Sequence, residues 1–165
     1  MAALTVWLFE VDRIDEVLES AGEFKQLGLI DYFDVALVSW LAGSDRPELT
    51  RLPELAGDNR FNDAFWAQLF GVTFFPASLG AGLGVAGAAV NDEELGLTPA
   101  MAATLRDEMR PGTAALFVYS SGASAQDGAA SEEIRRRRKG VPLRLLSSNL
   151  TSEQDEHLRA VYRGA

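Results

Sequence analysis

The feature that most constrains this chain is a stretch of 27 residues, 64–90, that carries no charged side chain. The first half of this stretch is aromatic, and the second half consists mostly of glycine and alanine. An apolar surface of this size on a soluble protein has to be covered by something. Three partners could bury this surface: the chain's own domain, a second copy of the chain, or a lipid bilayer.

The stretch exceeds the ~20 residues that cross a bilayer as one helix, but its sequence disfavours a single span. Pro76 breaks or kinks a helix, and each interior glycine costs roughly 1 kcal/mol relative to alanine. Both flanks are acidic, with Asp63 before and Asp92 after, so neither carries the Lys/Arg excess of a cytoplasmic flank. We therefore expect two short helices, about 64–75 and 77–90, folded as a hairpin about Pro76 within an insert at about 61–91.

Small residues spaced four positions apart in the second helix would leave a groove on one helix face, where another backbone can approach closely. The aromatic half supplies bulk to fill such a groove. Because a small domain has little core to spare, we expect this hairpin to pack between copies. The expected self-association interface comprises Phe65, Trp66, Phe70, Phe74, Phe75, Gly80, Gly84, Gly87 and Ala88.

Hydrophobic periodicity divides the rest of the chain into strands and helices. Strands are expected at residues 4–10, 34–41, 113–120 and 142–147. Helices are expected at residues 14–24, after the Thr98-Pro99 N-cap, over 122–140, and after a capping box formed by Thr151 and Gln154. Residues 43–60 are expected to form a polar connection.

This order predicts an α+β fold, a ferredoxin-like βαβ-βαβ sandwich in one domain spanning residues 1–165. The glycine-rich apolar helical hairpin is inserted between the second and third strands, and a C-terminal helix follows the fourth. Right-handed crossovers would place both crossover helices on one face of the sheet.

Four segments in order resemble the bacterial DUF1269 family. They are residues 28–38 (GLIDYFDVALV), the block that begins at Ala64 with AFW, residues 92–97 (DEELGL) and residues 109–118 (MRPGTAALFV). Proteins of this family are labelled predicted membrane proteins of unknown function. The resemblance implies a βαβ-type core with a glycine-rich helical insert, and it offers no catalytic residue to carry over.

Charge and composition exclude several functional classes. With 24 acidic and 15 basic residues the net charge is −9, which disfavours nucleic-acid binding. The absence of cysteine excludes disulfides and thiolate sites. The amino terminus lacks the basic region of a signal peptide, so we expect a cytoplasmic protein, membrane-associated if the hairpin meets lipid. One basic run is expected either to form a solvated helix end or to contact an anionic lipid surface, nucleic acid or the acid-rich residues 1–60 of a neighbouring copy: Arg135, Arg136, Arg137, Arg138 and Lys139.

No residue set points to catalysis, a cofactor or a metal. His157 is the single histidine, and imidazole-based metal sites need two or more. The glycines at 80–84 lack the lysine and the preceding strand of a phosphate loop. The acids at 92–94 lack the glycine-punctuated loop of a calcium site.

The sequence thus favours a non-enzymatic, self-associating structural protein whose hairpin, residues 64–90, joins copies into a homo-oligomer. The alternative is a membrane-associated protein anchored by the same hairpin. A third hypothesis is a small-ligand binder or enzyme, for which the sequence identifies neither a site nor a ligand.

Overall fold

The protein is described by a computed structural model, which places residues 3–26, 32–52, 54–55, 61, 63–74, 98–120 and 144–161. These residues form an α+β structure. The strands are β1 (Ala3–Glu10), β2 (Tyr32–Trp40), β3 (Glu48–Arg51), β4 (Thr113–Ser120) and β5 (Arg144–Asn149). The helices are η1 (Val11–Arg13), α1 (Ile14–Gln26), α2 (Asp63–Phe74), α4 (Pro99–Glu108) and α6 (Ser152–Val161).

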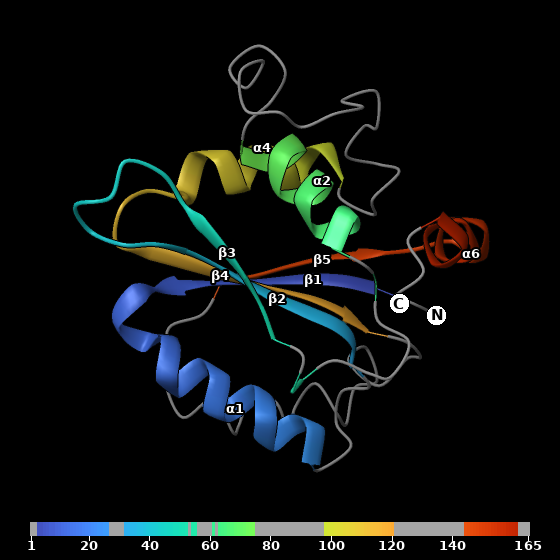
Figure 1. The fold of residues 1–165 in the computed structure, drawn as a ribbon, viewed down its shortest axis with the longest axis horizontal. Coiled ribbons are helices and arrows are strands. Elements are labelled where there is room, and N and C mark those ends of the chain that lie inside the picture. The colour runs from blue at the N-terminus through green and yellow to red at the C-terminus, as the bar shows by residue number, and fades with distance from the viewer. Residues whose placement is uncertain are drawn as a thin grey trace.

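The strands form one antiparallel sheet in the order β3-β2-β4-β1-β5 (Figure 1). Strand β4 is central and pairs with both β1 and β2 along its length. The register between β2 and β4 shifts between Tyr32 and Asp34, so that Phe33 is an extra residue in β2. Such a bulge re-aims the side chains next to it, and here it precedes the buried carboxylate of Asp34.

Both faces of the sheet are apolar, and helices cover both. Helix α1 lies on one face, and α2 with α4 lie on the other (Figure 1). Nearly every residue of β2 and β4 is buried, as expected of strands covered on both sides. The expected crossover helix at 122–140 lies outside the described residues, so the prediction that both crossover helices share a face has no test here.

On the α1 face, Val17, Ala21 and Phe24 pack against the sheet. The rings of Trp7 and Phe24 meet edge-on, with centroids 6.1 Å apart. The hydroxyl of Tyr32 donates a hydrogen bond to the carbonyl oxygen of Ala21 at 2.9 Å, and burial raises the pKa of this hydroxyl. A strand residue thereby ties the helix to the sheet by a buried hydrogen bond.

On the opposite face, α2 and α4 pack against each other and against the sheet. Helix α4 buries Met101 and Leu105, and Met109 at its C-cap is also buried. Thr98 caps it, since its hydroxyl oxygen accepts a hydrogen bond from the backbone N–H of Met101 at 3.1 Å. The predicted N-cap is therefore confirmed.

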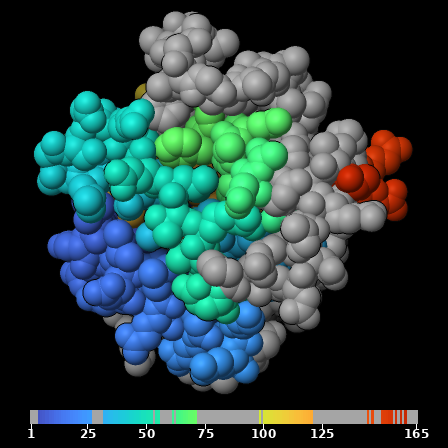
Figure 2. Space-filling model, viewed as in Figure 1, coloured from blue at the N-terminus to red at the C-terminus, as the bar shows by residue number. Residues whose placement is uncertain are grey.

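Strand β3 corrects the expectation that residues 43–60 form only a polar connection. Residues 48–51 pair with the edge of β2, from Ser39↔Glu48 to Ala36↔Arg51. Figure 2 shows this segment at the surface, between α1 and α2. A four-residue strand with one large apolar side chain, Leu49, carries too short a pattern to be recognised from periodicity.

Candidate functional site

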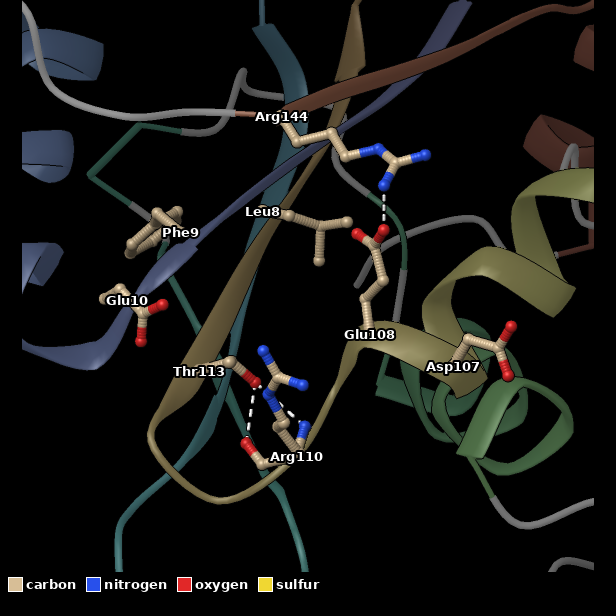
Figure 3. Close-up of a pocket in the computed structure, with 8 residues that line it drawn as sticks. All are labelled: Leu8, Phe9, Glu10, Asp107, Glu108, Arg110, Thr113 and Arg144. Atoms are coloured by element: carbon tan, nitrogen blue, oxygen red, sulfur yellow. Dashed lines mark hydrogen bonds and ion pairs between the residues drawn. The ribbon is translucent and has the colours of Figure 1, made fainter.

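A cleft of about 550 Å³ lies where β1, β4 and β5 meet the carboxyl end of α4 (Figure 3). It is lined by Leu8, Phe9, Glu10, Asp107, Glu108, Arg110, Thr113 and Arg144. An ion pair between Glu108 and Arg144 joins α4 to β5. The hydroxyl of Thr113 is already engaged, because it accepts from the backbone N–H of Arg110 at 3.0 Å and donates to the Arg110 carbonyl at 2.7 Å.

The charged side chains on this cleft lie mostly at exposed positions, including Glu10, Asp107, Arg110 and Arg144. Catalytic sites bring a nucleophile, a base and a stabilising donor together in a shielded space. Among the described residues, no such set lines the cleft. The arrangement is that of solvated surface charges above an apolar floor.

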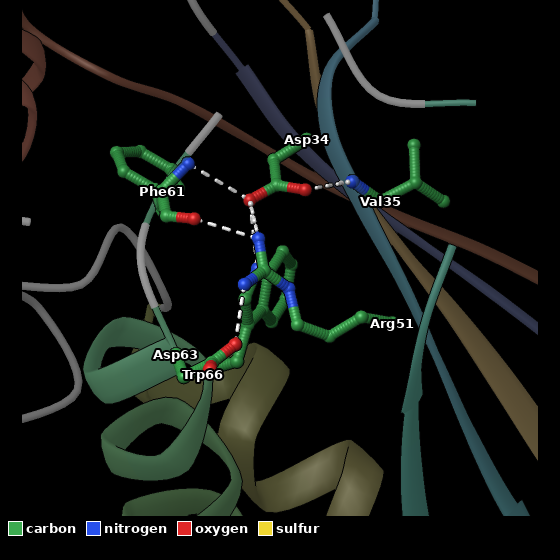
Figure 4. Close-up of polar contacts among 6 residues, drawn as sticks. All are labelled: Asp34, Val35, Arg51, Phe61, Asp63 and Trp66. Atoms are coloured by element: carbon green, nitrogen blue, oxygen red, sulfur yellow. Dashed lines mark hydrogen bonds and ion pairs between the residues drawn. The ribbon is translucent and has the colours of Figure 1, made fainter. Parts of the chain in front are cut away.

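A different cluster of polar groups joins α2 to the sheet (Figure 4). We call it the Asp34 cluster, and it comprises Asp34, Val35, Arg51, Phe61, Asp63 and Trp66. Oδ2 of Asp34 accepts hydrogen bonds from the indole Nε1 of Trp66 at 2.8 Å, the backbone N–H of Phe61 at 3.0 Å and Nη2 of Arg51 at 3.2 Å. Oδ1 accepts from the backbone N–H of Val35 at 2.9 Å.

Arg51 connects the carboxylate to the start of α2. Its Nη2 also donates to the carbonyl oxygen of Phe61 at 2.6 Å, and its Nη1 pairs with Oδ1 of Asp63 at 2.5 Å. The guanidinium therefore holds groups from β2, from residue 61 and from α2 in one network. This fork of parallel donors suits arginine better than lysine.

Aromatic rings surround the carboxylate. Phe61 contacts Phe33, Phe65 and Tyr119 with ring centroids 4.7, 4.1 and 5.3 Å apart. Trp66 contacts Phe65 and Tyr119 at 5.1 and 5.8 Å. These rings exclude water, so Asp34 is only 1 % exposed. The docking surface of α2 thus combines an aromatic core with one buried ionisable group.

Two opposing influences act on the pKa of Asp34. Burial raises it and is the larger influence, while the hydrogen bond from Trp66, the charge of Arg51 and the backbone donors lower it. The net result is a pKa above the ordinary value of 3.8. All four groups that contact this carboxyl are donors, which suit the ionised form, yet the aromatic surroundings penalise that form.

The Asp34 carboxyl is buried, and each of its oxygens already accepts a hydrogen bond from the protein, so the group is not presented to solvent. The cluster acts as an anchor that fixes the position of α2 and, through it, the point from which the rest of the uncharged stretch continues. Among the described residues it is the one place where a buried carboxyl meets a cation.

Two residues of the predicted self-association interface lie inside the subunit. Phe65 is 0 % and Trp66 1 % exposed, and both pack against the sheet of their own subunit. Phe70 is half-buried and packs against the same apolar core. The physical reason is that the sheet offers a second apolar face, which α2 covers.

The other predicted contact residues are not placed. The side chain of Phe74, at the end of α2, lies outside the described residues. So do Phe75, Gly80, Gly84, Gly87 and Ala88, and the basic run Arg135, Arg136, Arg137, Arg138 and Lys139. The predicted first helix of the hairpin corresponds to α2, and the predicted second helix falls in the undescribed part.

The described residues contain no group of three or more potential metal ligands. Among the helices that the structure describes, none is both long and apolar enough to cross a bilayer.

The Asp34 cluster was missed by sequence reasoning. Asp34 stands in an otherwise apolar strand, in alternation with Ala36 and Val38 on the core face. A carboxylate at such a position is rarely buried without partners, and this was the available signal. Its partners come from residues 51–66, too far along the chain for a spacing rule to connect them.

Ser120 is a buried polar residue, and its replacement tests the description of the core by its effect on stability. Its side-chain oxygen is buried and has no hydrogen-bond partner among the described residues, and an unsatisfied buried hydroxyl is destabilising. We expect Ser120→Ala to raise the free energy of unfolding by about 1 kcal/mol. Urea denaturation would show a higher midpoint with an unchanged slope.

Thr113→Ala provides the matched control, because the Thr113 hydroxyl is hydrogen-bonded to the backbone of Arg110 and to the sulfur of Met109. This variant should lose about 0.5–1 kcal/mol. A Ser120→Ala variant that loses as much as the control would contradict the description of Ser120 as unpartnered.

Comparison with known proteins identifies the family of the chain. No curated protein and no solved structure matches the chain. The family model described as "Protein of unknown function (DUF1269)" matches residues 61–163, more than half of the 165 residues. The match includes α2, α4, β4, β5 and α6, and it begins at Phe61 in the Asp34 cluster. The chain therefore belongs to the DUF1269 family, as the resemblance predicted.

Proposed function

We propose that the protein is a non-enzymatic, self-associating building block. The contact segment, which we define as residues 75–90, supplies the contact between copies. These residues complete the uncharged stretch beyond the carboxyl end of α2. In this proposal the contact segment takes over the role that the sequence alone had given to the whole stretch 64–90.

One observation carries the proposal: the first half of the uncharged stretch is already placed, and both faces of the sheet are already covered. Phe65, Trp66 and Leu69 fill the face opposite α1 together with α4. The uncharged sequence nevertheless continues to Val90. The described residues already cover both faces of the sheet, which supports a second surface as the partner of residues 75–90, and a second copy always brings the same segment.

We further propose that the fold is ferredoxin-like, with β3 added at one edge and the hairpin inserted between β2 and β4. Two interleaved βαβ units would place β1 and β4 in the centre and β2 and β5 beside them. The order β2-β4-β1-β5 with antiparallel pairing supports this. The insert would then grow from α2, which the Asp34 cluster holds against the sheet.

The test compares the mass of the wild type with that of Gly84→Leu by light scattering across a range of concentrations. We expect a wild type heavier than one chain, and a shift toward the monomer in Gly84→Leu because leucine blocks close backbone approach. Gly22→Leu is the matched control, since a Cβ at Gly22 in α1 meets nothing within 4 Å. It should keep the mass of the wild type.

A wild type that is monomeric at every concentration would overturn the proposal. So would a Gly84→Leu variant with an unchanged oligomeric mass. Protein that sediments with membranes until detergent is added would favour the membrane-associated alternative instead.

A further inference from the structure

We propose that β3 is a second contact surface, through which two copies of the chain pair edge to edge and join their sheets into one. The two β3 strands run antiparallel across a two-fold axis at Thr50. This contact is separate from the contact segment, so it goes beyond the proposed function and does not rest on it.

Strand β3 lies at the edge of the sheet. It stands first in the order β3-β2-β4-β1-β5, so β2 is its one neighbour among the described strands. Glu48 and Thr50 are exposed, and Leu49 and Arg51 are partly exposed. Figure 2 shows the strand at the surface, between α1 and α2. An edge strand in this position offers its outward backbone groups to another strand.

The hydrogen bonds to β2 determine which backbone groups point outward. The N–H of Leu52 donates to the carbonyl oxygen of Val35 at 3.2 Å, and these two residues lie directly opposite each other in the register. Opposite residues in an antiparallel pair alternate between bonded and non-bonded pairs. Thr50 therefore bonds to β2, whereas the N–H and C=O of Leu49 and Arg51 point away from it. Within the described part of the chain, no group takes up these outward N–H and C=O groups.

One two-fold register satisfies all of these groups. It places Leu49 opposite Arg51 of the second copy, and symmetry repeats this pair on the other side of the axis. Both pairs are bonded pairs, so each exchanges two backbone hydrogen bonds. Thr50 then lies opposite Thr50 of the second copy in a non-bonded pair, where side chains are closest. Threonine pairs across strands are favourable.

The two neighbouring symmetric registers are poorer. Placing Leu49 opposite its own copy puts Arg51 opposite Pro47, which has no N–H to donate. Placing Arg51 opposite its own copy brings two like charges together, which is destabilising. Pro47 directly precedes the strand and thereby blunts the open-ended pairing to which longer edges are prone. The residues that restrict this edge thus also select one register for it.

Amide hydrogen exchange, resolved by residue and measured on the full chain at increasing protein concentration, tests the pairing. The Leu49 and Arg51 amides should exchange freely in dilute protein and become protected in concentrated protein. Their protection should rise about threefold for each tenfold increase in concentration once pairs predominate, by mass action. The Thr50 amide, which bonds to β2 within the subunit, should be protected throughout. Protection of Leu49 and Arg51 that does not depend on concentration would overturn the proposal.

Charge substitution at Thr50 tests the register. Thr50→Lys or Thr50→Glu alone places like charges opposite each other across the axis, so the Leu49 and Arg51 amides should stay unprotected at every concentration. An equimolar mixture of the two variants should restore the protection, because lysine then lies opposite glutamate. Ala103→Lys, at an exposed position of α4, is the matched control and should behave as the wild type. Wild-type protection in either single variant, or no recovery in the mixture, would overturn the proposal.

Repeating the exchange on Gly84→Leu separates this contact from the contact segment. Concentration-dependent protection of Leu49 and Arg51 that persists in this variant, with an oligomeric mass equal to that of the wild type, would keep the β3 pairing and reject the contact segment. An oligomeric wild type whose Leu49 and Arg51 amides stay unprotected would keep the contact segment and reject the β3 pairing.

Discussion

Replacing Asp34 by alanine is expected to lower the free energy of unfolding by about 3–5 kcal/mol. The substitution leaves the Trp66 indole and the backbone N–H groups of Val35 and Phe61 without an acceptor in a space that excludes water. It also removes the buried partner of Arg51. Urea denaturation followed by circular dichroism measures the loss.

Asp63→Ala is the matched control, because it removes the other carboxylate that Arg51 binds. The Asp63 side chain is exposed to water, and exposed ion pairs contribute only about 0–1 kcal/mol. The account therefore predicts a small loss for Asp63→Ala and a large one for Asp34→Ala. Similar small losses in both variants would show that the Asp34 cluster does not anchor α2.

The second large effect is expected for Phe65→Ala, at about 3–5 kcal/mol. Phe65 contacts Phe61, Trp66 and Tyr119 through its ring, and its removal would leave a cavity between α2 and the sheet. Denaturation at a concentration where the chain is monomeric isolates this intramolecular contribution. The loss of unfolding free energy in Phe65→Ala would then reflect packing within one subunit.

Leu41→Ala is the control for Phe65→Ala. Leu41 is 52 % exposed, the one large hydrophobic residue so exposed in the described part of the chain, and its truncation should change stability by less than about 0.5 kcal/mol. A Phe65→Ala variant that keeps its stability but loses its oligomeric mass would restore the expectation that Phe65 lies between copies.

Local signals were the most predictable part of the fold. The capping box at the start of α6 is confirmed in both directions: Thr151 N–H donates to Oε1 of Gln154 at 2.9 Å, and Gln154 N–H donates to Oγ1 of Thr151 at 3.1 Å. The cap at Thr98 and the strands β1 and β4 also lie where the sequence placed them. Each depends on residues within a few positions, which a periodicity or capping rule can read.

Contacts between distant segments were not predictable in this way. The indole of Trp66 meets the carboxylate of Asp34 across 32 positions, and no spacing rule connects them. Phe65 and Trp66 find room within their own subunit because the two-sided burial of β2 and β4 creates two apolar cores.

We propose that the uncharged stretch is divided: α2 packs within its own subunit, and the contact segment meets a second copy. The chain has no cysteine, so a single introduced cysteine carries one spin label. We predict strong dipolar coupling between copies for a label at Gly84→Cys and weaker coupling at Leu41→Cys. The absence of coupling at Gly84→Cys, at concentrations where the wild type is oligomeric, would contradict the account.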